Sequence, residues 1–200
     1  IDMPAGPSEV MIIADGSADA EFVASDFLSQ AEHGPDSQSI LLTSDVSLAE
    51  RLPEVIEQCL AKLPRQEMMR RSLSHSHVIL LADDDEMLAF ANEYAPEHLI
   101  INTVNADALA ERVQNAGSVF IGPYSPESAG DYASGTNHTL PTSGYAKAYS
   151  GVNIDSFTKK ITFQRLTRDG LRAIGRAVEV MAESEDLMAH RMAVTVRMNK

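Results

Sequence analysis

Two side chains that can bind a metal, Gln30 and His33, stand three residues apart in the segment SQAEHGPDSQ. Residues at this spacing share one face of a helix. The apolar spacing before them predicts a helix over about 20–33, ended by Gly34 and Pro35. We therefore expect Gln30 and His33 to emerge together at a helix end. An imidazole and an amide oxygen can hold a borderline cation such as zinc, although two ligands are too few for a site. The alternative is a polar helix terminus in which the helix dipole favours His33.

A second group of polar side chains lies in SPESAGDYASGTNH, which brings Glu127, Asp131 and His138 into one loop after an apolar run. Ligands of open α/β sheets bind beyond the carboxyl ends of strands, so this loop is a candidate site. Its glycines do not have the spacing of a dinucleotide fingerprint or of a phosphate-binding loop. The alternative is a turn followed by a capped helix.

A third segment, EYAPEHLI, places Glu97 next to His98 at a turn between a helix and a strand. A carboxylate beside an imidazole supplies two bases that can act in separate proton transfers. The alternative is a surface histidine beside a solvated glutamate. The three loops lie at one edge of the predicted sheet, and this convergence favours a common site.

Apolar runs that alternate with helical patterns position these loops. Strands are predicted within 8–15, 37–45, 77–83, 98–103 and 118–123, and helices at about 20–33, 46–63, 84–94 and 107–115. This order predicts an α/β fold with a largely parallel sheet and helices on both faces, an incomplete Rossmann-like arrangement. The acidic run at 83–86 is expected to cap a helix.

After Pro123 an irregular segment runs to about residue 153, and helical patterns then return. Leu171, Ile174, Val178 and Met181 form one apolar stripe, and a final helix carries His190 before a β-like end, AVTVRM. This C-terminal helical tail is too small to form its own core. We expect it to pack on the sheet domain or on another subunit.

The composition narrows the possible partners and the cellular location. A formal net charge of -13 disfavours nucleic acid and anionic membrane surfaces as partners. The single cysteine, Cys59, cannot form an internal disulfide, which fits a cytoplasmic setting. The sequence has neither a signal-peptide pattern nor an apolar run that could span a membrane. It begins without Met and runs directly into a strand, so we expect it to be part of a longer chain.

Four segments resemble signature blocks of histidinol dehydrogenase, the zinc-dependent enzyme of the last two steps of histidine biosynthesis: DMPAGPSEV, FVASDFLSQAEHGPDSQ, PEHLI and SPESAGDYASGTNH. The resemblance covers essentially all 200 residues and corresponds to the carboxyl-terminal half of the family's chain. It implies that residues 1–9 end a preceding segment, 10–150 form a zinc- and substrate-binding α/β domain, and 151–200 form a helical dimerisation tail. Most contacts with NAD would then lie outside this sequence, and the isolated chain is expected to be inactive.

The resemblance also implies a role for individual residues. It implies four zinc ligands, namely Gln30, His33, Asp131 and His190. The residues that it implies for binding histidinol are Ser8, Gln30, His33, His98, Asp131, His138, Glu185 and His190. His98 would take the hydroxyl proton in the first oxidation, and Glu97 would activate water in the second. The implied homodimer has crossed tails, so that Glu185 and His190 serve the partner's site.

Two other functions remain open on the sequence. One is a non-catalytic module that binds zinc and dimerises. The other is a zinc hydrolase, which four protein ligands disfavour because they leave a poor open position on the metal.

Overall fold

The computed structural model describes residues 3–200, which divide into two compact units, one ending at Phe157 and one spanning Thr158–Lys200. The predicted tail begins at residue 151, whereas the first unit of the structure also includes the short 3-10 turn Ile154–Phe157. A second 3-10 turn, Tyr145–Lys147, lies within the predicted first domain.

Within the described residues, the first unit is built on a five-stranded parallel sheet in the order β3-β2-β1-β4-β5. The strands are β1 (Glu9–Ala14), β2 (Gln38–Thr43), β3 (His77–Leu80), β4 (His98–Asn102) and β5 (Ser118–Ile121). The chain moves outward from β1 to β3 and then returns to the other side of β1, so the strand order reverses between β1 and β4. The predicted α/β fold with a parallel sheet is confirmed.

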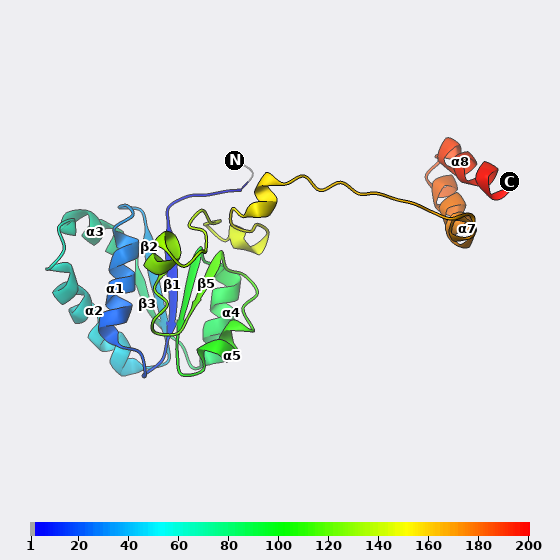
Figure 1. Cartoon of the computed structure of the whole chain (residues 1–200). Helices are drawn as coiled ribbons and strands as arrows, with labels where there is room; N and C mark the ends of the chain where they lie inside the picture. Colours follow the sequence, from blue (N-terminus) through cyan, green and yellow to red (C-terminus); the bar gives the residue numbers. More distant parts are fainter. Residues whose placement is uncertain (1–2) are drawn as a thin grey trace. The chain divides into compact units, whose positions relative to one another are not determined.

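Helices cover both faces of this sheet (Figure 1). One face packs on α1 (Ala20–Ala31), α2 (Val46–Leu60) and α3 (Gln66–Leu73), and the other on α4 (Asp84–Tyr94) and α5 (Ala106–Ala110). Successive strand residues point to opposite faces. Accordingly, Val10 and Ile12 belong to the first core, and Met11 and Ile13 belong to the second.

Aspartates begin three of the helices. Asp19, Asp45 and Asp83 precede α1, α2 and α4, and each side chain accepts a hydrogen bond from a backbone N–H of the first turn. Such caps satisfy donors that have no partner within the helix. The capping role predicted for the acidic run is confirmed by Asp83, which accepts from Glu86 N–H at 3.0 Å.

Three helix bounds differ from the sequence prediction. The helix at 20–33 ends at Ala31, so that His33 lies in the following turn. The helix predicted over 46–63 ends at Leu60, and a separate α3, which the sequence analysis did not predict, follows Pro64 and buries Met69. The helix predicted over 107–115 is shorter in the structure, where α5 spans Ala106–Ala110.

The second unit is a helical hairpin of α7 (Arg168–Ser184) and α8 (Met188–Met198). The β-like interpretation of AVTVRM is wrong, because this segment forms the second half of α8. Tertiary packing overrides the strand preference of its β-branched residues. Gly175 of α7 leaves room for the Met198 side chain, and the Thr195 hydroxyl donates a hydrogen bond to the Glu179 carboxylate.

Among the described residues, no helix has the length and apolar character that crossing a bilayer requires.

Candidate metal and proton-transfer site

The polar groups singled out in the sequence meet at the amino edge of the sheet. Glu9 and His98 are the first residues of β1 and β4, and Val10 pairs with His98 in the parallel register. The end of α1 returns to this edge because the helix connects two parallel strands. The prediction that the site lies beyond the carboxyl ends of the strands is therefore wrong. At the carboxyl end of β1, the Asp15 carboxylate instead accepts hydrogen bonds from the backbone N–H groups of Ser17 and Val104.

The adjacent bases Glu97 and His98 are buried, with exposed fractions of 4% and 2%, which excludes the surface alternative. The backbone of Glu9 orients both side chains. Its N–H donates to Glu97 Oε2 at 2.9 Å, and its carbonyl oxygen lies 3.2 Å from His98 Nδ1. Because a carbonyl oxygen only accepts, this hydrogen bond requires the proton on Nδ1. Nε2 is then the basic nitrogen, and within the described residues it is buried without a hydrogen-bond partner.

The surroundings of Glu97 suit a general base. Burial raises the pKa of its carboxyl, and the charge of His98, the Glu9 N–H and the Ser8 hydroxyl partly offset this effect. Glu97 Oε2 lies 3.6 Å from His98 Nδ1. A carboxyl whose pKa is raised toward neutral pH is a stronger base that still ionises, as general base catalysis requires.

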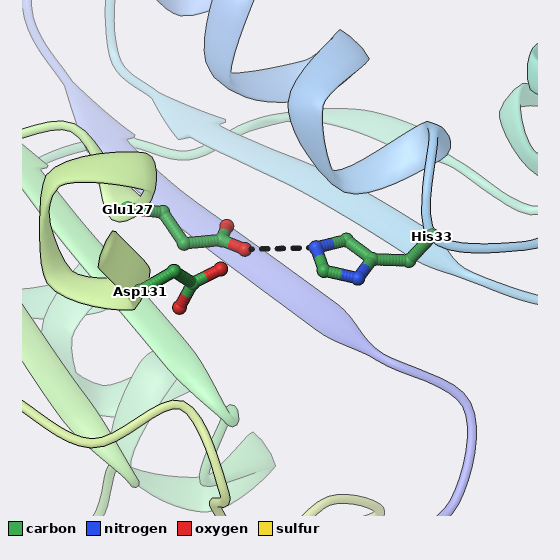
Figure 2. A group of neighbouring side chains, drawn as sticks. All are labelled: His33, Glu127 and Asp131. Atoms are coloured by element: carbon green, nitrogen blue, oxygen red, sulfur yellow. Dashed lines mark ion pairs between the residues drawn. The ribbon is translucent and has the colours of Figure 1, made fainter.

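A group that could hold a metal ion lies beside these bases. His33, Glu127 and Asp131 each offer one ligand atom, and these atoms lie within 4.8 Å of one another (Figure 2). His33 comes from the turn after α1, whereas Glu127 and Asp131 lie on the short helix α6 (Glu127–Tyr132). His33 Nε2 is 3.6 Å from Glu127 Oε1, and the hydrogen bond with Glu127 raises the pKa of His33 despite partial burial. All three residues line a pocket of about 360 Å³.

Gln30 does not emerge at the surface beside His33 as expected. Its side chain is completely buried in the last turn of α1, whereas the His33 side chain is 44% exposed beyond the helix end. Both amide atoms of Gln30, and Glu127 Oε2, are buried without a hydrogen-bond partner in the described part of the chain. Such orphaned atoms are rare and need an explanation. His33, Glu127 and Asp131 offer an imidazole nitrogen and carboxylate oxygens, which suit zinc. The unpaired amide oxygen of Gln30, near the end of α1, is a further donor that would suit it.

The other residues singled out by the resemblance lie in different places. Ser8 is half-buried beside Glu97, within the same site. His138 is exposed after α6, and no hydrogen bond or ion pair joins it to His33 or Glu97 within residues 3–200. Glu185 and His190 belong to the second unit, where Glu185 follows α7 and His190 lies in α8, both exposed.

Sequence reasoning did not assign roles to three buried acids at this edge. Glu127 is 1% exposed, Glu9 is 7% exposed, and Asp26 of α1 is 9% exposed. Burial, followed by the charge of Glu127, raises the pKa of Asp26 to about 7. Glu127 lies in a segment that the sequence analysis discussed. Its spacing of four residues from Asp131, which places both carboxylates on one helix face, could have identified it.

Known proteins resemble this chain over nearly its whole length. A family model described as histidinol dehydrogenase matches residues 1–198. Histidinol dehydrogenase of Bacteroides thetaiotaomicron is 60% identical over 199 residues, which cover 100% of this chain and 46% of that protein. The Haemophilus influenzae protein of the same name is 56% identical over 200 residues, 100% of this chain and 47% of that protein.

A solved structure gives the same result. The crystal structure of histidinol dehydrogenase from Elizabethkingia anophelis matches with a TM-score of 0.94 and 55% identity, over 99% of this chain and 46% of that one. The chain thus spans about half the length of the relatives that it matches. With the family model matched over nearly every residue and these identities over the whole chain, the protein belongs to the histidinol dehydrogenase family.

Proposed function

We propose that this chain provides the zinc- and substrate-binding part of an NAD-dependent oxidation of L-histidinol, through L-histidinal, to L-histidine. The observation that carries the proposal is the buried Glu97 and His98 pair, oriented by one backbone residue and placed beside the group of His33, Glu127 and Asp131. Two bases at one site fit a reaction with two successive oxidations.

Each base has a distinct task. In the first oxidation, Nε2 of His98 takes the proton of the substrate hydroxyl while the carbon loses a hydride, which leaves an aldehyde. In the second, Glu97 takes a proton from the water that attacks the aldehyde carbon. The resulting hydrate then loses a hydride and becomes a carboxylate. The raised pKa of Glu97 strengthens it as a base for this water.

Gln30, His33 and Asp131 would hold the metal together with His190 of a second copy. When bound, NAD would accept each hydride and zinc would hold the imidazole and amino nitrogens of histidinol. Ser8, Glu185 and His138 are further candidates for contacting the substrate. The family membership and the tail support a homodimer that shares its sites, and the free Cys59 fits a cytoplasmic location.

Ligand binding tests this proposal. Isothermal titration of the zinc-loaded chain with L-histidinol should give a binding signal that disappears after zinc removal with a chelator. L-leucinol, an amino alcohol without an imidazole, should bind much more weakly. His33→Ala should reduce zinc affinity by at least the roughly 10- to 100-fold typical of changes in outer-shell groups, whereas the exposed His75→Ala should not. Zinc uptake without any preference for histidinol would favour the alternative, a non-catalytic zinc-binding and dimerisation module.

The two bases can be separated in a full-length enzyme that carries these residues. His98→Asn should slow oxidation of the alcohol, and Glu97→Gln should mainly slow oxidation of the aldehyde, each by roughly 10²- to 10⁴-fold. Rates are measured by NADH absorbance with histidinol and with histidinal supplied directly. If Glu97→Gln oxidised histidinal at the normal rate, the assignment of the water-activating base to Glu97 would be wrong.

A further inference from the structure

Glu127 contacts both functional parts of the site. Its Oε1 lies 3.6 Å from His33 Nε2, in the proposed metal-binding group, and 3.8 Å from Nδ1 of His98, the proposed base. Glu127 is 1% exposed, and its Oε2 has no hydrogen-bond partner among the described residues. One buried carboxylate therefore lies between two imidazoles, one from the turn after α1 and one from the start of β4 (Figure 2 shows the His33 contact).

The position of Glu127 is fixed by its helix. Gly130 of α6 lies against Phe120 of β5, where an added Cβ would come 2.5 Å from the ring. The Phe120 ring in turn lies beside the His98 ring, with centroids 6.0 Å apart. The helix that carries Glu127 therefore packs on the side chain that borders the base.

We propose that Glu127 is a positioning residue that couples occupancy of the metal site to the orientation of His98. Without a metal, Oε1 is shared between the two rings. A cation bound at His33 Nε2 replaces the hydrogen on that nitrogen and attracts the Glu127 carboxylate, which belongs to the same group of possible ligands. The cation then holds Glu127 in place as a hydrogen-bond acceptor for His98 Nδ1–H, which supports the tautomer in which Nε2 is the base. This inference rests on the proposed metal-binding role of His33.

The test uses the full chain labelled with ¹⁵N-histidine, and it reads imidazole nitrogen signals by two-dimensional NMR. Wild type is compared with Glu127→Gln, a neutral variant of similar shape. The matched control is Glu32→Gln, because Glu32 is an exposed acid that lines the same pocket without an ion pair to either imidazole. Zinc affinity is measured in parallel by competition with a chromophoric chelator. If Glu127→Gln does not fold, Glu127→Asp replaces it in the test. Aspartate keeps the negative charge, but its shorter side chain brings the carboxylate less close to the two imidazoles.

The proposal expects zinc to shift the His98 signals in wild type and in Glu32→Gln, although His98 is not a ligand, and to leave them unshifted in Glu127→Gln. Zinc affinity should fall by about 10- to 100-fold in Glu127→Gln. An equal zinc response of His98 in wild type and Glu127→Gln would overturn the proposal. Absence of zinc binding by wild type would instead contradict the proposed function. The metal-free spectra would still test the contact between Glu127 and His98. If Glu127→Gln left the His98 signals unchanged, that contact would be refuted.

Discussion

Buried acids define this site at the scale of single residues. Glu9, Asp26, Glu97 and Glu127 are each less than a tenth exposed, in a chain whose formal net charge is -13. Burial raises the pKa of Glu9 and of Glu97, and raises that of Asp26 to about 7. Buried charges are costly unless they are paired. A bound cation would supply the missing countercharge, so the site lowers the stability of the metal-free protein.

Asp26 gives this cost a measurable pH dependence. Its pKa of about 7 in the folded protein exceeds the roughly 3.9 of an ordinary aspartate, so its protonated form favours folding. This contribution is fully present below about pH 4 and is lost as the pH rises through 7. Asp26→Asn removes this titration. The free energy of unfolding of the variant, relative to that of wild type, should therefore rise by about 1 to 4 kcal/mol from pH 4.5 to pH 8.

Urea denaturation in the presence of a chelator, at both pH values, measures this gain. The exposed Asp36→Asn serves as the control and should follow wild type at each pH. A gain in Asp26→Asn that is equal at the two pH values would contradict the assigned cause.

The sequence predicts some of these residues better than others. Gln30 with His33, and Glu97 with His98, are close in the chain, so local spacing identified them as candidates. The partnership of Glu127 with His33 and His98 joins residues that are far apart in sequence, and it forms only when α6 packs against Phe120. The burial of Gln30 was equally hidden, because it depends on how α1 packs in the folded unit.

At the scale of elements, the position of the short helix α6 depends on a single glycine. Gly130 lies between Glu127 and Asp131, and a Cβ there would come 2.5 Å from Phe120 Cε1 and 2.7 Å from Thr136 Oγ1. The aromatic ring is packed beside His98 and cannot easily yield. A methyl group at this position must therefore move the helix.

Gly130→Ala should accordingly weaken zinc binding by about tenfold or more, because both carboxylates of α6 shift together. Gly34→Ala is the matched control, since a Cβ at Gly34 meets nothing within 4 Å although the residue adjoins His33. Chelator competition measures both affinities. Equal zinc affinity in the two variants would show that α6 tolerates the methyl group without displacement.

The regular elements were easier to predict than α6 or α8. The period of the apolar residues located α1, α2 and α4, and the acidic run was expected to cap the last of these, since both signals are local. The segment AVTVRM of α8 has β-branched residues, and the sequence therefore predicts a strand there. Its helical state depends on Gly175 and Glu179 of α7, which no local signal in α8 reports.

At the scale of the whole molecule, the second unit exposes apolar surface that its own two helices leave uncovered. Within α7, the residues buried are Gly175, Glu179 and Ala182, while Ile174 and Met181 are 47% and 63% exposed. Met188 and Met192 of α8 are also more than half exposed. Exposed apolar stripes of this kind mark interaction surfaces. The expected homodimer would cover this stripe.

Charges placed on the stripe should therefore separate the dimer. Ile174 and Met181 lie seven residues apart on one face of α7, whereas Ala173 is rotated by about 100° around the helix. We expect wild type and the control Ala173→Glu to sediment as dimers, and Ile174→Glu and Met181→Glu to sediment as monomers, by analytical ultracentrifugation. If His190 completes the partner's metal group, the monomeric variants should also bind zinc more weakly than Ala173→Glu. A monomeric wild type, or dimers in all four proteins, would mean that this stripe does not hold two copies together.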